Sequence, residues 1–370
     1  MTYTERYLAD LRRVQAAVPA LERLEGSRIL ITGAGGLIGS ALVDVLMARG
    51  GIQIWAAGRD TEKLRRRFAH WEGREQLQFL TYDAAQPICA DVKFDYLIHG
   101  ASPANPAAYS AQPVETMTAN FLGTYHVLRY AHDCGAKRVV YISSSEVYGR
   151  KEGSQPYHEQ EYGFVDLLNP RACYPCSKRA AETLCAAYAK EYGVEAVILR
   201  PGHVYGPTAT QADNRASSQF PRDVKAGLDI VMKSPGAQLR SYCYVLDCAG
   251  AVLTAMLLGE VGHAYNISNR NSVVTIRQMA QAFADLGGMF GLAGLPLASA
   301  ESIYYLRSYL PLLTVAVVGA TPLVRNAALR MQARCGWVSV LRVAVAMLLL
   351  LVCTAYLVDG SFNPFLYFRF

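Results

Sequence analysis

Short apolar runs alternate with stretches of helical periodicity between residues 28 and 200. Each run has the length of a buried strand, and several of the stretches between them carry apolar residues at the spacing of a helix face. The runs are RILIT, IQIWAA, LQFLTY, DYLIH, RVVYIS and VEAVILR. Helices are predicted at residues 37–49, about 114–134 and about 176–192, with a charged helix after the second run. Strands that alternate with helices require right-handed crossovers, so the pattern predicts a doubly wound α/β domain whose parallel sheet is covered on both faces.

The segments before and after residues 28–200 have different residue patterns. Residues 1–25 have apolar positions at helical spacing between charges, which predicts an N-terminal helical arm. Residues 26–200 form the predicted nucleotide-binding domain. Residues 201–287 are richer in glycine, proline and polar residues, and we expect a smaller substrate-binding lobe over the carboxyl ends of the strands. Residues 288–370 contain neither lysine nor histidine and predict a hydrophobic helical tail.

Charge and cysteine content exclude several classes of protein. The formal net charge is +6, but residues 288–370 hold six arginines against two acidic residues, which leaves about +2 for the rest. A nucleic-acid partner is therefore not expected, because the one basic cluster, Arg65 to Arg67, shares a predicted helix with acidic Glu62 and fits a solvated face. Nine cysteines at irregular spacing, with no signal peptide at the amino end, predict reduced thiols in a cytosolic setting.

A glycine-rich turn follows the first predicted strand. In TGAGGLIG, Gly33 suits a tight turn, Gly36 allows close approach of a pyrophosphate, and Gly39 allows the helix to contact the strand. The turn lies between a strand and a helix, the context of a Rossmann-type fold in which the helix amino terminus faces the phosphates. The residues expected to bind the dinucleotide here are Gly33, Gly35, Gly36, Leu37, Ile38 and Gly39.

The end of the second strand bears on the choice between NAD and NADP. Ala57 stands where an acidic residue would hold the adenosine ribose of NAD, and Arg59 follows it. A guanidinium at this place can hold a 2′-phosphate, so the sequence favours NADP. Asp60 is an alternative ribose ligand. In a purely structural interpretation, Asp60 or Thr61 caps the next helix.

Two chemistries compete for the stretch CYPCSK. Cys173 and Cys176 form a Cys-x-x-Cys pair, but no second cysteine pair completes a zinc site and we expect no metal. Tyr174 and Lys178 form the only Tyr-x-x-x-Lys in the chain. A phenol titrates near pH ~10 unless an ammonium stabilises the phenolate, and Lys178 lies one helical turn along. With the hydroxyl of Ser144, which the strand before ISSSEVYG delivers to the same sheet edge, this pair predicts a proton-abstraction site beside a nicotinamide.

With these motifs in place, residues 28–287 resemble an extended short-chain dehydrogenase/reductase of the NAD-dependent epimerase/dehydratase family, which acts on nucleotide sugars. TGAGGLIG, HGASPA, SSSEVYG, the Tyr-Lys pair and RPGHVYGP occur in the order of that family. The resemblance implies that Asp83 contacts the adenine, and that Ala101 and Asn120 also contact the cofactor. Within the family, HGASPANP, SSEVYG, NPRACY and KRAAETLCAAYAKEYGVE most resemble the UDP-glucuronate decarboxylases.

The likeness to the decarboxylases extends to the substrate. It implies that Glu146 is a catalytic carboxylate, and it implies four substrate contacts: Ser102, Ser145, Arg215 and Arg240. In a structural interpretation, Glu146 only satisfies backbone amides at a helix start. Two features depart from the pattern. Ala57 replaces the acidic NAD ligand, and the carboxyl-terminal lobe stops earlier than in the decarboxylases.

The resemblance implies a shared first step, in which Tyr174 removes the proton of the sugar 4-hydroxyl while the C4 hydride passes to NAD(P)+. The 4-keto sugar can then lose carbon dioxide, lose water, or be reduced to an epimer. Glu146 favours more than epimerisation, and Ser145 disfavours dehydration because serine is a poor acid. We expect decarboxylation or related 4-keto chemistry. A nucleotide-sugar 4-epimerase, or an impaired fusion that only binds cofactor, is the alternative, and a homodimer is expected.

The tail resembles another family. MFGLAGLPLASAESIYYLRSYLP and NPFLYFRF are similar to the carboxyl end of membrane-bound O-acyltransferases. No acyl transfer is expected, because the last histidine is His263 and that family uses a histidine in its membrane part. Val343 to Val358 gives sixteen residues without a charge, all apolar except Thr354, which predicts one membrane span with a cytoplasmic catalytic domain held at the inner or plasma membrane. A buried helix that completes the shortened lobe is the alternative.

Overall fold

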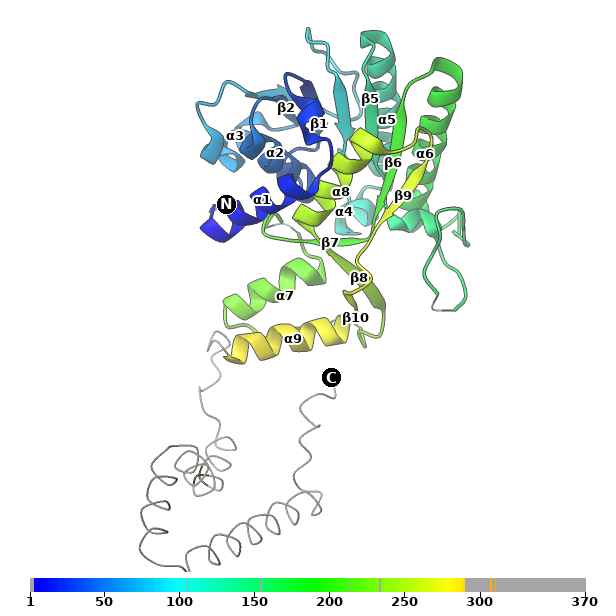
Figure 1. Cartoon of the computed structure of the whole chain (residues 1–370). Coiled ribbons are helices and arrows are strands. Elements are labelled where there is room, and N and C mark those ends of the chain that lie inside the picture. The colour runs from blue at the N-terminus through cyan, green and yellow to red at the C-terminus, as the bar shows by residue number, and fades with distance from the viewer. Residues whose placement is uncertain are drawn as a thin grey trace, which may run out of the picture. The chain divides into compact units, whose positions relative to one another are not determined.

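A computed structural model describes residues 3–289, apart from residues 105, 154, 212 and 233, and also residues 307 and 310 (Figure 1). The chain divides into two compact units. The first comprises Met1–Asp223 and Val231–Ala280, and the second comprises Val224–Ile230 and Gln281–Phe370. The described part of the second unit holds residues 224–230, the carboxyl-terminal part of helix α9 (Ile276–Met289), and residues 307 and 310.

The first unit is built on a seven-stranded parallel sheet in the order β3-β2-β1-β4-β5-β6-β9. Its strands are β1 (Arg28–Thr32), β2 (Gln53–Gly58), β3 (Leu77–Thr81), β4 (Tyr96–His99), β5 (Arg138–Ile142), β6 (Ala196–Pro201) and β9 (Ala264–Ile267). The six runs of the sequence pattern are the first six of these strands, so the predicted doubly wound fold is confirmed. Strand order reverses between β1 and β4, the place where sheets of this kind bind ligands at their carboxyl ends.

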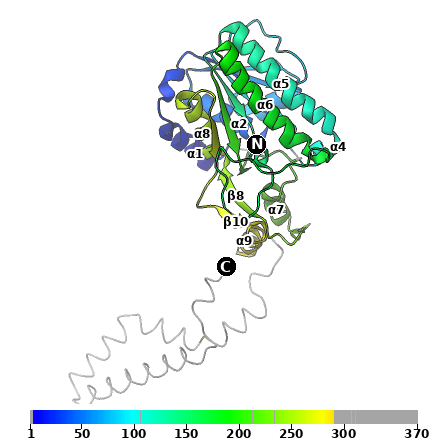
Figure 2. The same cartoon turned by 90° about the vertical axis from the view of Figure 1, so that its right-hand side faces the viewer.

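Helices cover both faces of the sheet. Helices α5 (Pro113–Cys134) and α6 (Cys173–Tyr192) lie side by side on one face (Figure 2). Helices α2 (Leu37–Arg49) and α8 (Val245–Leu258) contact each other on the opposite face. Strand β1 serves both cores, because Ile29 and Ile31 belong to one buried cluster and Leu30 to the other. Burial on both faces explains why the strands are continuous apolar runs.

The remaining elements are short or lie at the ends of the main ones. They are α1 (Glu5–Ala17), η1 (Leu21–Leu24), α3 (Thr61–Arg67), η2 (Ala69–Trp71), α4 (Pro106–Ala111), η3 (Ser145–Tyr148), η4 (Pro170–Ala172), β7 (His203–Tyr205), α7 (Ala216–Lys225), β8 (Leu239–Tyr244) and β10 (Val273–Thr275). Here η marks a helix with the tighter 3₁₀ winding.

The predicted N-terminal arm is an integral layer of the first unit. Helix α1 contacts α2 and α8, and Leu11 and Leu24 are fully buried in the same core as those helices. Asp44 on α2, itself inaccessible to solvent, accepts hydrogen bonds from the hydroxyl of Tyr7 at 2.8 Å and from Nε1 of Trp71 at 2.9 Å. The amphipathic pattern of residues 1–25 therefore marks a core-facing helix.

Part of the predicted substrate lobe belongs to the nucleotide-binding sheet. Strand β9 pairs with β6, and α8 packs beside α2, although both lie within residues 201–287. The apolar side chains of these two elements are buried in the main core, which is the physical reason for the difference. What remains separate is a small sheet in the order β10-β8-β7.

None of the helices in the described part of the chain is long and apolar enough to cross a bilayer. The predicted span from Val343 to Val358 lies outside the described residues and stays a prediction.

Candidate active site

The carboxyl ends of β1 and β4 are joined by a buried hydrogen bond. Oγ1 of Thr32 and Nδ1 of His99 lie 2.7 Å apart, and the backbone amide of Ala101 donates to the same Oγ1 at 3.3 Å. Burial lowers the pKa of His99 to about 3, so its imidazole is neutral near pH 7. These contacts fix the sheet edge beneath the glycine-rich turn.

The glycine-rich turn has the shape that a dinucleotide requires. Gly33 has φ +69°, and a Cβ there would lie 2.7 Å from the carbonyl carbon of Gly100. At Gly39 a Cβ would lie 2.4 Å from the carbonyl oxygen of Gly33, so helix and turn approach too closely for any side chain. Gly36 is the N-cap of α2 and offers no side-chain acceptor to the first-turn amides, including those of Leu37 and Ile38. The residues present therefore fit a pyrophosphate at this helix terminus.

The residues expected around the adenosine leave neighbouring strands. Gly58 and Thr81 are paired at the ends of β2 and β3, so Arg59 and Asp83 follow at the same edge of the sheet. Both side chains are exposed. Asp60 caps α3 by accepting from the amide of Lys63 at 2.9 Å, as the structural interpretation of the sequence proposed. Because Asp60 is engaged as a cap, Arg59 is the exposed charged residue of this turn that could bind a ligand.

Asn120, expected among the cofactor contacts, lies inside the domain. It is 1% exposed, and its Nδ2 donates to Oγ of Ser177 at 3.0 Å. Its Oδ1 is buried without a hydrogen-bond partner in the described part of the chain. Ser177 in turn donates to the carbonyl of Cys173 at 2.6 Å, so Asn120 connects α5 to the first turn of α6.

Tyr174 and Lys178 are both buried at the start of α6. Burial raises the pKa of Tyr174 to about 12, and a hydrogen bond with Ser144 opposes the rise. Lys178 is 2% exposed and donates from Nζ to the carbonyl oxygen of Ile142 at 2.8 Å. Burial lowers the pKa of Lys178 to about 7. Its Nζ lies 5.8 Å from the ring centroid of Tyr174, and the expected lowering of the phenol pKa is absent because burial is the largest influence on that group.

Glu146 lies on η3, for which Ser144 is the N-cap and Ser145 the first residue. Its two carboxylate oxygens both accept from Nη2 of Arg171 at 3.0 Å. An ion pair, rather than the backbone amides of a helix start, is thus the partner of this carboxylate. Arg171 also donates to the hydroxyl of Tyr109 at 2.9 Å. Neither residue was predicted, although Arg171 lies within the quoted motif NPRACY.

The cysteines of CYPCSK lack the properties of a redox pair. Cys173 and Cys176 are both free thiols. Burial raises the pKa of the Cys173 thiol, whereas a reactive cysteine needs a lowered one. Sγ of Cys173 donates instead to the carbonyl of Tyr109 at 3.5 Å. These observations favour the Tyr-Lys interpretation of the stretch.

The expected substrate residues come from three parts of the chain. Ser102, in the loop after β4, lies near enough to Tyr174 to lower its pKa, and so does Arg215. Arg215 forms an ion pair with Asp213 at 2.6 Å. Burial lowers the pKa of His203 to about 4, helped by the charges of Arg240 and then Arg215, so these three side chains share one region. His203 was not among the predicted site residues, although it lies within the quoted motif RPGHVYGP.

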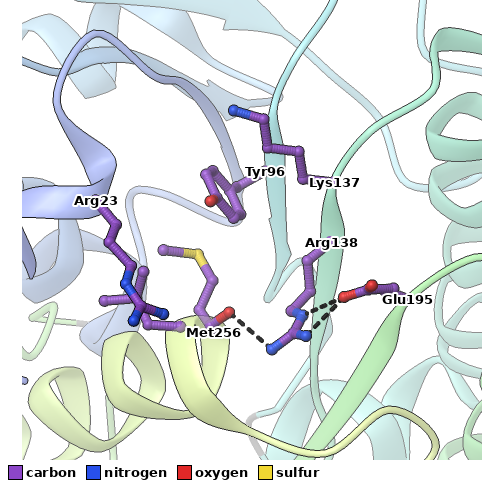
Figure 3. Close-up of a pocket in the computed structure, with 7 residues that line it drawn as sticks. Arg23, Tyr96, Lys137, Arg138, Glu195 and Met256 are labelled. Atoms are coloured by element: carbon purple, nitrogen blue, oxygen red, sulfur yellow. Dashed lines mark hydrogen bonds and ion pairs between the residues drawn. The ribbon is translucent and has the colours of Figure 1, made fainter. Parts of the chain in front are cut away.

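A cavity of about 310 Å³ lies away from all of these residues, at the amino-terminal edge of the sheet (Figure 3). Arg138 bridges it, donating to Glu195 at 2.6 Å and to the carbonyl of Met256 at 3.2 Å. Lys137 is paired with Asp95 at 3.1 Å. The charges that line this cavity thus hold β5, β6 and α8 together, and no predicted site residue faces it.

Comparison with known proteins assigns the chain to a family. A model described as "NAD dependent epimerase/dehydratase family" matches residues 29–268. UDP-glucuronic acid decarboxylase 1 of Xenopus tropicalis is 34% identical over 273 residues, which are 73% of this chain and 63% of that protein. UDP-glucuronic acid decarboxylase 3 of Arabidopsis thaliana is 34% identical over 70% of this chain and 74% of its own length. The chain thus matches less than two thirds of the Xenopus relative.

Solved structures share the fold. The UDP-glucose 4-epimerase of Thermotoga maritima with UDP-glucose has a TM-score of 0.61 at 24% identity, over 70% of this chain and 82% of that one. The dTDP-glucose 4,6-dehydratase of Bacillus anthracis in complex with NAD has a TM-score of 0.61 at 19% identity, over 71% and 81%. With the glycine-rich turn and the Tyr-Lys pair in place, the chain belongs to the NAD-dependent epimerase/dehydratase family.

Proposed function

We propose that the protein oxidises the C4 hydroxyl of a nucleotide sugar to a 4-keto intermediate and then decarboxylates it, as a UDP-glucuronate decarboxylase would. The observation that carries the proposal is the convergence of Ser144, Tyr174 and Glu146 at the sheet edge where the glycine-rich turn also lies. The names of the relatives supply the reaction, since those described are UDP-glucuronic acid decarboxylases.

The residues of the chain have separate tasks in this proposal. NAD(P)+ held by Gly33, Gly36 and Gly39 would supply the acceptor for the C4 hydride and return it at the end. Tyr174 takes the proton of the 4-hydroxyl, and Ser144 holds the reacting oxygen by a hydrogen bond. The phenol is protonated at neutral pH in the present geometry, since its pKa is about 12. Only the phenolate can accept the proton of the 4-hydroxyl, so the phenol proton must first pass to solvent, and positive charge near the ring favours that loss.

Glu146 directs the 4-keto intermediate toward decarboxylation. A carboxylate on C5 of a 4-keto sugar belongs to a β-keto acid, whose C5–carboxylate bond breaks to give carbon dioxide and leaves an electron pair on the enolate. A proton must then reach C5, and Glu146, which is paired with Arg171, is a carboxylate whose charge acts on Tyr174. A 4-epimerase needs no such pair, so epimerisation ranks second. Binding of cofactor without turnover ranks third.

The test is incubation of purified protein with UDP-, dTDP-, GDP- and CDP-sugars, with products read by mass spectrometry. Loss of 44 mass units, that of carbon dioxide, from a UDP-uronate supports decarboxylation, provided that Tyr174→Phe abolishes it. Loss of 18 units would indicate dehydration. A product of unchanged mass but new stereochemistry would indicate epimerisation. No product from any sugar, with cofactor bound, would leave only the cofactor-binding alternative.

The cofactor is proposed to be NAD(P)+ with a preference for NADP. Arg59 supports the preference, since the buried Ala57 offers no carboxylate for a ribose and Asp60 is engaged as a helix cap. Against it stands the Bacillus neighbour, which was solved in complex with NAD. Titration of both cofactors decides the question.

A homodimer is proposed to form through the outer surface of α5. This helix exposes a stripe of large apolar side chains, at positions that lie on one helix face: Val114, Met117, Phe121, Leu122 and Tyr125. Exposed apolar patches of this kind are typical of interaction surfaces. Sedimentation should show a dimer that Phe121→Glu dissociates. Leu258→Glu, at a comparably exposed position on α8, should leave the dimer intact.

The catalytic unit is proposed to be cytoplasmic and attached to the inner or plasma membrane by residues 288–370. The support is the sequence alone, through the sixteen uncharged and almost entirely apolar residues from Val343 to Val358. The full chain should sediment with membranes and require detergent for extraction. A full-length chain that stays monomeric in buffer without detergent would contradict this proposal.

A further inference from the structure

The loop that leads into α6 places one arginine between two distant segments. Arg171 on η4 donates from a single nitrogen, Nη2, to both carboxylate oxygens of Glu146 on η3. The same nitrogen donates to the hydroxyl of Tyr109 on α4. The guanidinium carbon also lies 4.3 Å from the centroid of the Tyr109 ring, within the range of a cation–π interaction. One side chain therefore fixes two others, 25 and 62 residues away in sequence.

The ring of Tyr109 in turn lies against the ring of Tyr174. The two rings are stacked, with centroids 5.0 Å apart and an angle of 24° between their planes. They are 2% and 6% exposed, and together with Cys173 they form a small buried cluster of their own. Because this cluster is separate from both main cores, the stacked ring of Tyr109 is a main packing partner of the Tyr174 ring.

Folding stability does not explain the arginine. The side chains of Arg171 and Glu146 are 44% and 39% exposed. Ion pairs this accessible to water add little to stability, because solvent screens them and two flexible side chains must be ordered. Their geometry matters more for the site. Glu146 is oriented from one side and the Tyr109–Tyr174 stack from the other, by the same nitrogen.

We propose that Arg171 is a positioning residue of the reaction. It holds the Glu146 carboxylate in place and, through Tyr109, keeps the Tyr174 ring aligned. The kinetic consequence rests on the function proposed above. Loss of Arg171 should lower kcat and leave KM nearly unchanged, because the misplaced groups act on the reacting atoms rather than on the nucleotide.

The kinetic test compares Arg171→Ala, Arg171→Lys and a control, Arg13→Ala, which also loses an exposed ion pair but on α1. With UDP-glucuronate, Arg171→Ala should lose about 30-fold or more in kcat, with KM within about threefold. Added ethylguanidinium should restore part of that kcat, because the site is open to solvent. The kcat of Arg171→Lys should lie between those of Arg171→Ala and wild type, and the kcat of Arg13→Ala should match wild type. An Arg171→Ala enzyme with wild-type kcat would overturn the proposal.

A second readout does not depend on turnover. In protein labelled with 3-fluorotyrosine, the ¹⁹F signal of Tyr174 is assigned by its loss in Tyr174→Phe. This signal should shift in Arg171→Ala and stay in Arg13→Ala, since only the former releases the stacked ring. If wild type converts no nucleotide sugar, the proposed function fails, while a shifted Tyr174 signal still supports the positioning role. A Tyr174 signal unmoved in both Arg171→Ala and Arg171→Lys overturns it. Should Arg171→Ala not fold, the lysine variant carries both readouts.

Discussion

Lys178 donates from Nζ to the carbonyl oxygen of Ile142 at 2.8 Å, across the end of β5. The amine is 2% exposed, and this burial lowers its pKa to about 7 from the ordinary 10.5. The group that should supply positive charge to Tyr174 is thus only partly charged at neutral pH. Its titration links the site to the stability of the whole unit.

That link predicts a pH dependence of unfolding. Between pH 7 and 10.5 the unfolded chain binds a proton at Lys178 that the folded chain does not, so stability rises with pH in this window. The slope is at most about 1.4 kcal/mol per pH unit. In urea unfolding, the free energy of unfolding of wild type should therefore rise by about 2 kcal/mol relative to that of Lys178→Met between pH 7 and pH 9. A difference that stays constant would show that the lysine is charged when folded.

Substitutions in CYPCSK separate the two chemistries proposed for it. Tyr174→Phe removes the proton acceptor and little else, so turnover should be lost while cofactor binding, followed by fluorescence, stays nearly intact. Cys173→Ser with Cys176→Ser should keep activity within a few-fold, because burial makes Cys173 a poor thiolate. An inactive double serine variant beside an active phenylalanine variant would restore the redox interpretation.

The glycine-rich turn allows a matched pair of substitutions. Gly33 and Gly50 both have positive φ, +69° and +75°, so alanine strains the backbone at either place. Only at Gly33 would the new Cβ meet backbone, 2.7 Å from Gly100, whereas nothing lies within 4 Å at Gly50. Gly50→Ala should cost about 1 to 3 kcal/mol of stability and leave cofactor binding unchanged. Gly33→Ala should cost more and abolish binding measured by calorimetry. Equal effects of the two substitutions would show that close approach at Gly33 is unimportant.

The spacing of apolar residues predicted most of the fold, because the strands and helices that form both main cores carry their buried residues at that spacing. Helix α2 begins at Leu37 and ends at Arg49, as predicted, since it lies between a glycine N-cap and a glycine C-cap. The assignment of β9 and α8 to a separate lobe failed for a physical reason. Strand pairing across the sheet joins β9 to β6, and no local pattern in a 4-residue strand reports its partner.

The site shows the same division. The glycines, Tyr174 and Lys178 were selected because their chemistry depends on spacing along the chain. Arg171 and Tyr109 were missed because their roles arise from contacts between η3, η4 and α4, which are distant in sequence. Charged residues in loops are common, and only the fold shows that this arginine faces Glu146.

The proposed NADP preference makes a sharp prediction at Arg59. Its exposed guanidinium follows β2 with the neighbouring carboxylate of Asp60 engaged by the amide of Lys63. Arg59→Ala should weaken the binding of NADP by about 1.5 to 3 kcal/mol, the range of a charge-assisted hydrogen bond, and should change the affinity for NAD far less. Calorimetric titration of both cofactors into both proteins measures this. Equal affinities throughout would remove Arg59 from the site.

The last prediction concerns the attachment of the N-terminal helix. Asp44 is fully buried, and besides Tyr7 and Trp71 it accepts from Nη2 of Arg67 at 2.9 Å and from the hydroxyl of Tyr3 at 2.5 Å. Removal of one partner from a buried ion pair leaves the other charge uncompensated, so Asp44→Ala should destabilise the unit by about 3 to 5 kcal/mol.

The control is Asp247→Ala, which breaks an ion pair with Arg13 whose side chains are 53% and 63% exposed. It should change stability by no more than about 0.5 kcal/mol, because solvent already screens that pair. Both values come from urea unfolding, and hydrogen exchange in α1 supplies a local readout. Amides of α1 should exchange faster in Asp44→Ala than the global loss of stability accounts for, since two of the four donors to Asp44, Tyr3 and Tyr7, join the N-terminal segment to α2. Unchanged protection of α1 would show that its apolar face, with Leu11 and Val14 buried, holds the helix without the aspartate.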